Sequence, residues 1–376
     1  MMSPRENLLQ TLRCEKPQWI PVCPYLFSNE NPVRGVPEAL GEVFRLSSGA
    51  LAGNILKLGE YLGADDYLLP VPAPADLVSD TCSVETREAE KGKFIKILST
   101  PKGQLRQISE AMPGYPGMVT ERYVKALADV PKLIEYFNSL RVRAAPETVK
   151  KIQDVKKMAG GRGALFCRTN GTPLGMCYRV YSDITNLIYM IADEPGTMKE
   201  LFDCMEEKYF KLYEGMLRAA PEIDAFFGMD DTSTTLISPD MFDSFNVELI
   251  NRRADLCHAN GKIYMHHSCG LIRGLLPVYR KTRMNGVDAF IAPPVGNVGY
   301  AEGREILGPG YSMIAGLANG LGAMDEDAIR RHVARRFKDA RRAGNVVFYV
   351  GGAHLSFAAL EMIFAEARKL KTRKES

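Results

Sequence analysis

Apolar residues in the second half of the chain alternate between helical spacing and short continuous runs. A Ser-Pro pair begins a predicted helix over 238–260, and an Asn-Gly pair ends it. A strand over 262–267 and a helix over 270–285 follow. The same signals predict strands over 287–291, 312–315 and 346–350, with a helix over 325–343 before the last of them. This order is typical of the βα alternation of a parallel sheet.

The first half of the chain fits the same alternation less regularly. Strands are predicted over 20–27, 164–167 and 225–228, and long helices over 184–192 and 195–218. A total of roughly seven or eight strands favours a (β/α)8 TIM barrel, an α/β fold. A doubly wound open sheet is the structural alternative, although no Gly-x-Gly-x-x-Gly follows the first strand.

Residues 84–108 interrupt the alternation. This stretch is polar and strand-prone, with Ile95 and Ile97 on either side of Lys96 and turn signals at 91–92 and 101–103. We interpret it as a small antiparallel insertion that forms a lid or rim at the barrel mouth. The expected organisation is therefore one barrel domain over 1–376.

Composition excludes several classes of protein. The chain has 376 residues, of which 46% are hydrophobic and 25% charged, and its net charge of +3 gives no sign of a nucleic-acid partner. The first 19 residues carry charges and no apolar core, so no signal peptide is expected, and no stretch is apolar enough to span a membrane. Eight scattered cysteines without a Cys-x-x-Cys pair favour reduced thiols and a cytoplasmic protein.

The sharpest chemical signal lies at the end of the strand over 262–267. Because side chains alternate along a strand, His267 and Cys269 point the same way and His266 points into the wall of the barrel. An imidazole beside a thiolate suits a zinc ion, and chemistry in TIM barrels sits at such strand ends. The alternative is a buried cysteine beside a hydrogen-bonded core histidine.

Other polar side chains follow predicted strands. Asp230 and Asp231 are candidates to hold a substrate or to act as general acid or base, and the alternative is a turn cap. Asn170 is a candidate substrate contact or a turn residue. His354 follows a double glycine after the last strand and is a candidate third metal ligand or substrate contact; the alternative is a surface or capping histidine.

These residues belong to a set of motifs that resembles the uroporphyrinogen decarboxylase superfamily. The resemblance spans nearly the whole chain, and its fold implies a (β/α)8 barrel. The motifs that carry it are Ser3-Pro4-Arg5-Glu6-Asn7, Lys16-Pro17, Ile20-Pro21-Val22, Ser99-Thr100-Pro101-Lys102-Gly103, Glu121-Arg122-Tyr123-Val124-Lys125, Ser238-Pro239, His267-Ser268-Cys269-Gly270 and Gly286-Val287-Asp288.

Within that superfamily the chain resembles the corrinoid-dependent methyltransferases more than the haem-pathway decarboxylase. The decarboxylase carries an Arg-Gln-Ala-Gly-Arg signature near the first strand, and residues 24–29 of this chain hold no arginine. The methyltransferase branch uses a His-x-Cys pair and a late cysteine as zinc ligands. His267 and Cys269 match the pair, but no cysteine follows Cys269. Either His354 or a carboxylate completes the site, or the metal is bound differently or lost.

The resemblance implies a zinc enzyme that moves a methyl group between a small methylated ether, amine or thiol and a corrinoid protein. Asp230 would orient the substrate or a ligand, and Tyr349 would be a substrate contact in an apolar wall that excludes water. The chain has no Asp-x-His-x-x-Gly motif, so cobalamin is expected on a separate corrinoid protein. Two alternatives are a metal-independent decarboxylase or other lyase, with Arg168 and Asp230 as its key residues, and a barrel that binds a ligand without catalysis.

Overall fold

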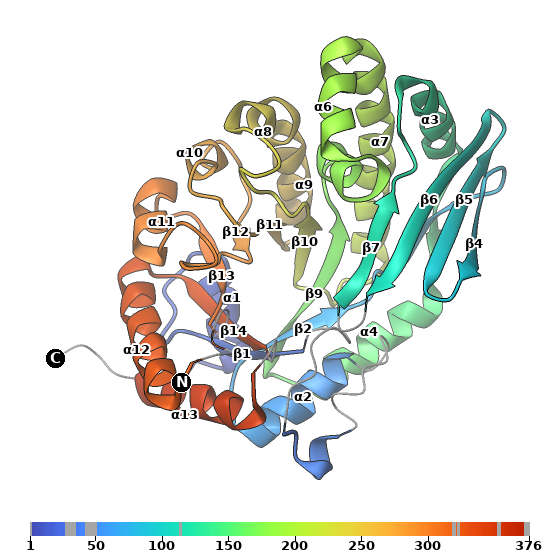
Figure 1. Cartoon of the computed structure of the whole chain (residues 1–376). Helices are drawn as coiled ribbons and strands as arrows, with labels where there is room; N and C mark the ends of the chain where they lie inside the picture. Colours follow the sequence, from blue (N-terminus) through green and yellow to red (C-terminus); the bar gives the residue numbers. More distant parts are fainter. Residues whose placement is uncertain are drawn as a thin grey trace.

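Eight parallel strands form the centre of the molecule (Figure 1). The structure is a computed structural model that describes residues 2–26, 35–41, 51–112, 115–317, 321, 324–351 and 355–371. Hydrogen bonds join the strands in the order β1 (Val22–Tyr25), β14 (Val346–Gly351), β13 (Ser312–Gly316), β12 (Gly286–Asp288), β11 (Ile263–His267), β10 (Ala225–Met229), β9 (Gly163–Asn170) and β2 (Tyr67–Val71). Since β1 and β2 also contact each other, the sheet is a nearly closed barrel, as predicted.

Helices surround the barrel on its outer face (Figure 1). The longest is α7, whose 25 residues run Pro195–Ala219. The remaining helical elements are η1 (Glu38–Leu40), α2 (Leu51–Leu62), η2 (Leu127–Asp129), α3 (Val130–Ser139), α4 (Pro146–Ala159), α5 (Pro173–Met176), the π-helical turn η3 (Cys177–Tyr181), α6 (Ile184–Asp193), α8 (Pro239–Phe245), α9 (Val247–Ala259), α10 (Leu276–Tyr279), α11 (Tyr300–Leu307), α12 (Glu326–Ala343) and α13 (Phe357–Lys371). No helix in the described ranges has the length and apolar character that a bilayer crossing requires.

The first helix closes the amino-terminal end of the barrel. In α1 (Pro4–Leu12), Leu8, Leu9 and Leu12 are buried in the same cluster as the inward-facing residues of the strands. In the barrel interior, the rings of Phe166 and Phe227 stack with 4.4 Å between their centroids. The interior is therefore apolar at this end, and polar side chains gather at the carboxyl ends of the strands.

A second, antiparallel sheet lies to one side of the barrel (Figure 1). It contains β4 (Ser83–Glu90), β5 (Lys93–Thr100), β6 (Gly103–Met112) and β7 (Tyr115–Glu121) in that order. The predicted insertion over 84–108 is confirmed, although its fourth strand was not predicted because a Pro-Gly pair within 115–121 resembles a turn. A separate pair, β3 (Ala75–Ser79) with β8 (Leu140–Ala144), was also not predicted.

Two helix predictions are corrected. The helix expected over 270–285 is helical only in α10, because Gly270 has φ of +93° and the amide of Leu271 donates to the Ser233 hydroxyl at 3.2 Å. These contacts hold the chain in an irregular loop after β11. The helix expected over 238–260 is two helices, α8 and α9, which meet at Asn246.

A buried histidine on α12 makes stability depend on pH. Burial, together with the charges of Arg336 and Arg335, lowers the pKa of His332 to about 4. Since the unfolded chain takes up this proton near pH 6.5, the free energy of unfolding falls as pH drops from 6.5 towards 4, by up to about 1.4 kcal/mol per pH unit. We expect His332→Gln to reduce this slope by about that amount in urea unfolding at pH 7, 6 and 5. Equal slopes for the two proteins would contradict the assignment.

Candidate metal centre

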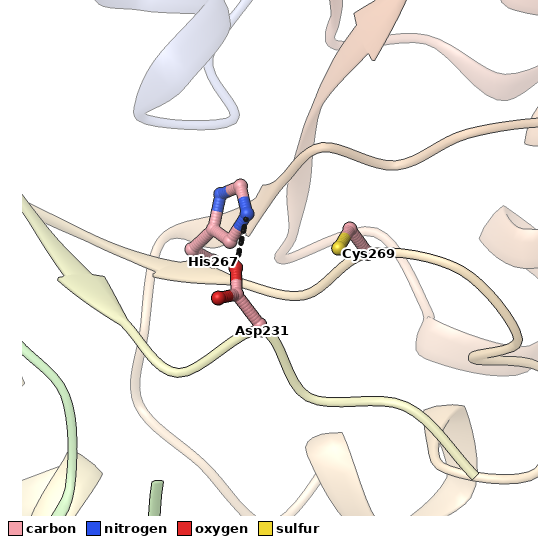
Figure 2. Close-up of side chains that lie close together, drawn as sticks. All are labelled: Asp231, His267 and Cys269. Carbon is pink, nitrogen blue, oxygen red and sulfur yellow. Dashed lines mark ion pairs between the residues drawn. The ribbon is translucent and has the colours of Figure 1, made fainter. Parts of the chain in front are cut away.

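Three side chains with metal-binding atoms meet at the carboxyl ends of β10 and β11. Asp231 follows β10, His267 is the last residue of β11, and Cys269 lies two residues further on. Their ligand atoms all lie within 4.8 Å of one another, and Figure 2 shows the three side chains converging from two neighbouring loops. His267 Nε2 lies 3.0 Å from Asp231 Oδ1. Nitrogen, sulfur and oxygen donors in one cluster are a set that zinc accepts.

The imidazole of His267 is held from its other side by Asp288. These residues are direct neighbours in the parallel pairing of β11 with β12, and His267 Nδ1 lies 2.7 Å from Asp288 Oδ2. Burial opposes protonation, but the carboxylates of Asp288 and Asp231 raise the pKa of His267 well above its ordinary value. A cation at Nε2 would displace a proton from a ring whose orientation is already fixed.

Asp231 is held in an uncommon backbone conformation. Its φ is +52°, in the left-handed region that non-glycine residues rarely adopt. Arg179 fixes the turn, because its Nε lies 2.6 Å from Asp231 Oδ2 and its Nη1 donates to the carbonyl of Met229. Burial opposes ionisation of Asp231, but hydrogen bonding to His267 and the charge of Arg179 keep its pKa below the ordinary value. Asp231 therefore presents an ionised carboxylate to His267.

Asp230 lies beneath this turn, with its side chain fully buried. Its Oδ1 accepts from the amide of Thr172 at 2.6 Å and its Oδ2 from the Thr172 hydroxyl at 2.8 Å. A Cβ at Gly171 would lie 1.8 Å from this carboxylate and one at Gly175 would lie 2.2 Å from it, so both positions need glycine. Burial raises the pKa of Asp230 to about 6. The structure thus places Asp230 where it supports the loop that carries Asp231.

His266 points away from the barrel interior, as the alternation of strand side chains predicted. Its ring meets Phe242 and Tyr279 at centroid distances of 5.6 and 5.9 Å, and its Nε2 lies 2.9 Å from the Thr232 hydroxyl. Burial lowers the pKa of His266 to about 3, so the ring is neutral. His266 therefore packs in the wall and does not face the cluster of Asp231, His267 and Cys269.

A cavity opens beside His267 inside the barrel mouth. Arg168, His267 and Asp288 supply its charged groups. Its remaining lining residues are apolar or aromatic: Cys23, Pro24, Tyr25, Leu68, Phe166, Phe227, Ala289, Ile314 and Tyr349. The cavity is thus a largely apolar chamber with His267 of the candidate metal centre in its wall, which is the arrangement expected of a small-molecule site.

The remaining sequence candidates occupy different places. Tyr349 lines the cavity, and its ring lies 5.3 Å from that of Tyr25. Asn170 is not among the lining residues of this cavity; its backbone carbonyl accepts a hydrogen bond from Arg253 at 3.2 Å. His354 lies outside the described residues. The described part of the insertion contributes no residue to the cavity lining.

Two residues of the site were not predicted as site residues from the sequence, although Asp288 belongs to the Gly286-Val287-Asp288 motif. Asp288 ends β12, and the position of an aspartate at the carboxyl end of a strand next to β11 is a signal that points to it. Arg179 lies in η3, outside the strands, and no local sequence signal connects it with Asp231.

Asp288→Asn is expected to lower metal affinity about 10–100-fold without removing a ligand atom. The amide no longer accepts a charge-assisted hydrogen bond from Nδ1–H, so His267 loses both basicity and orientation. Competition with a chromophoric chelator measures the change. Asp255→Asn is the matched control, because this exposed carboxylate pairs with Arg283 away from the cavity. An affinity equal to that of the control would contradict the role of Asp288.

Comparisons with known proteins give a family and a fold. A family model described as uroporphyrinogen decarboxylase matches residues 111–302, just over half of the chain. A solved methyltransferase from Methanosarcina mazei is 14% identical over 98% of this chain and 99% of its own, with a TM-score of 0.63. A D-psicose 3-epimerase from Clostridium cellulolyticum H10 is 10% identical over 59% of this chain and 81% of its own, with a TM-score of 0.35. A search of curated proteins finds no match.

Proposed function

The chain belongs to the uroporphyrinogen decarboxylase family, and from that premise we propose that it is a zinc-dependent methyltransferase. It moves a methyl group between a small methylated ether, amine or thiol and a corrinoid protein. The observation that carries the proposal is the cluster of Asp231, His267 and Cys269 beside an apolar cavity. A metal-independent lyase has no need of such a cluster.

The three side chains fit a catalytic zinc ion. Such sites use three protein ligands and leave one position for substrate. His267 would bind through Nε2, because Nδ1 is engaged by Asp288, and Cys269 and Asp231 would supply sulfur and oxygen. Asp231 would then be the third metal ligand, a role for which the sequence offered His354 or a carboxylate. Zinc held here would act as a Lewis acid towards the heteroatom that carries the methyl group.

The protein's own groups set the geometry and polarity of the site. Arg179 holds the carboxylate of Asp231, and Asp230 acts as a positioning residue through the turn that it anchors to Thr172. The aromatic walls at Tyr25 and Tyr349 would exclude water from the transferring methyl group. Arg179, Asp231 and Asp230 need not move far, since hydrogen bonds already hold each of them before a substrate enters.

Cobalamin would be supplied by a separate corrinoid protein at the barrel mouth. The chain has no Asp-x-His-x-x-Gly motif of its own with which to bind it. The methyltransferase from Methanosarcina mazei has the same fold over nearly the full length of both chains, which is consistent with this proposal.

Free cob(I)alamin can replace the corrinoid protein in a direct test. Zinc-loaded protein is incubated with cob(I)alamin and with a methyl ether, a methylamine or a methyl thioether, and methylcobalamin is followed by its absorbance. We expect methylcobalamin from one class of donor with the wild type and none with Cys269→Ser. A protein that contains zinc but transfers no methyl group from any of the three would contradict the proposal.

A further inference from the structure

Among the described residues, one arginine side chain faces the cavity without forming an ion pair with a carboxylate. Arg168 lies on β9, is solvent-exposed, and lines the same cavity as His267. Its Nη2 donates to the Tyr25 hydroxyl. Its guanidinium carbon lies 5.7 Å from the centroid of the Tyr25 ring and 5.6 Å from that of Phe166. Within the described residues no ion pair involves Arg168.

Two other arginines close to the barrel are neutralised. Arg253, on the outer side, pairs with Glu206, and Arg179 pairs with Asp231. The carboxylate that shares the cavity with Arg168 is Asp288, and Asp288 is taken by His267. Arg168 lines the cavity, and no carboxylate of the described residues takes its N–H donors. A guanidinium placed in this way can pair with an anion that enters the cavity.

The chemistry of the guanidinium indicates which kind of anion Arg168 would bind. Arginine presents a planar pair of N–H donors that match the two oxygens of a carboxylate, and it stays charged throughout the physiological pH range. The walls next to it, at Tyr25, Phe166 and Tyr349, are aromatic and suit a flat or apolar body. His267 of the candidate metal centre and its partner Asp288 lie in another part of the same cavity wall.

We propose that the substrate is a small methylated carboxylic acid whose carboxylate is bound by Arg168. Its apolar or aromatic body lies against Tyr25, Phe166 and Tyr349, and its methylated heteroatom faces His267. This inference rests on the proposed function for the identity of the methyl group, but the carboxylate subsite itself needs no metal. It narrows the ethers, amines and thiols considered above to those that also carry an acid group.

The test uses a pair of probes that differ in charge. Isothermal titration calorimetry measures the affinity of 4-methoxybenzoate and of its neutral isostere 4-methoxybenzamide. We expect the wild type to bind the carboxylate at least about tenfold more tightly than the amide, and Arg168→Gln to remove this preference. Arg168→Lys keeps the charge but loses the paired donors, so an intermediate preference is expected.

Arg162→Gln is the matched control. Arg162 lies 5.6 Å from the centroid of the Tyr67 ring on the outside of the barrel and pairs with exposed Glu60. The Arg162→Gln variant should bind both probes with the affinities of the wild type. Thermal unfolding shows whether each variant is folded, and if Arg168→Gln does not fold, the comparison of wild type with Arg168→Lys carries the test.

Metal removal separates this inference from the proposed function. The titrations are repeated on chelator-treated wild type and on Cys269→Ser. A carboxylate preference that survives there supports the subsite independently of the metal. The same preference in zinc-loaded wild type that transfers no methyl group would support the subsite and contradict the methyltransferase. Equal affinities for the two probes in the wild type, no binding of either probe, or a preference retained by Arg168→Gln would overturn the subsite whatever the metal content.

Discussion

Cys269→Ser and His267→Ala are each expected to lower zinc affinity by more than about 100-fold. Losing a residue that only hydrogen-bonds a metal ligand costs roughly 10–100-fold, and these substitutions remove a ligand itself. Each substitution removes a donor atom from a cluster in which all three lie within 4.8 Å of one another. The two that remain cannot complete a tetrahedral site with one open position. Methyl transfer should fall to the background rate in both variants, because the substrate heteroatom then has no Lewis acid.

Zinc titration against a chromophoric chelator measures this loss. Cys82→Ser is the control for Cys269→Ser and His258→Ala the control for His267→Ala. Each replaces a residue of the same type, and neither Cys82 nor His258 lines the cavity. They should bind zinc as the wild type does. Variants of Cys269 and His267 that hold zinc as tightly as these controls would show that the metal, if any, is bound elsewhere.

Glu206→Ala is expected to destabilise the fold by about 3–5 kcal/mol, the largest effect on stability that we predict. Glu206 is 3% exposed and pairs with Arg253, which is fully buried between α7, α9 and the outer side of the strands. Removing the carboxylate leaves a buried guanidinium beside the carbonyl of Asn170 and the side chains of Tyr209, Tyr213 and Tyr264, none of which supplies a compensating carboxylate.

The adjacent residue on α7 provides the control for this prediction. Glu207 is exposed and pairs with Lys211 one turn along the helix, so Glu207→Ala should cost less than about 0.5 kcal/mol. Urea unfolding of the two variants gives the comparison. Replacing the pair together, with Glu206→Leu and Arg253→Met, should recover most of the loss. Similar destabilisation by Glu206→Ala and Glu207→Ala would contradict this account of the buried pair.

The barrel was predictable because its signals are local. Glycines that end helices and short apolar runs placed seven of the eight strands, including β11 and β14. The strand that was missed, β2, contains Pro70, which argues against a strand in a sequence-based reading. The helix expected after β11 was wrong because the loop at Gly270 and Leu271 is fixed by contacts with Ser233 and Thr234, more than 30 residues away in sequence.

The site was predictable only where it follows from strand alternation. His267 faces the barrel mouth and His266 the wall because neighbours in a strand point opposite ways. The approach of Asp231 to His267 depends on its left-handed backbone and on Arg179, and neither follows from the residues next to it. The contact of His267 with Asp288 depends on the register of β11 with β12, which no local pattern fixes.

The elements around the candidate metal centre are fixed from several directions. Asp230 is anchored by Thr172, Asp231 by Arg179 and His267 by Asp288, so the segments that carry Asp231 and His267 each have their own support. Such supports hold metal ligands in their productive orientation before the metal binds. Variants of Thr172, Arg179 and Asp288 therefore probe the supports separately from the donor atoms themselves.

The central claim is that Asp231, His267 and Cys269 hold one zinc ion, and elemental analysis of the wild-type protein, purified without chelator, tests it most directly. The account predicts close to one equivalent of zinc per chain. Protein that contains no metal, even after incubation with zinc and removal of the excess, would contradict the methyltransferase and leave a barrel that acts on its substrate, or binds it, without a metal.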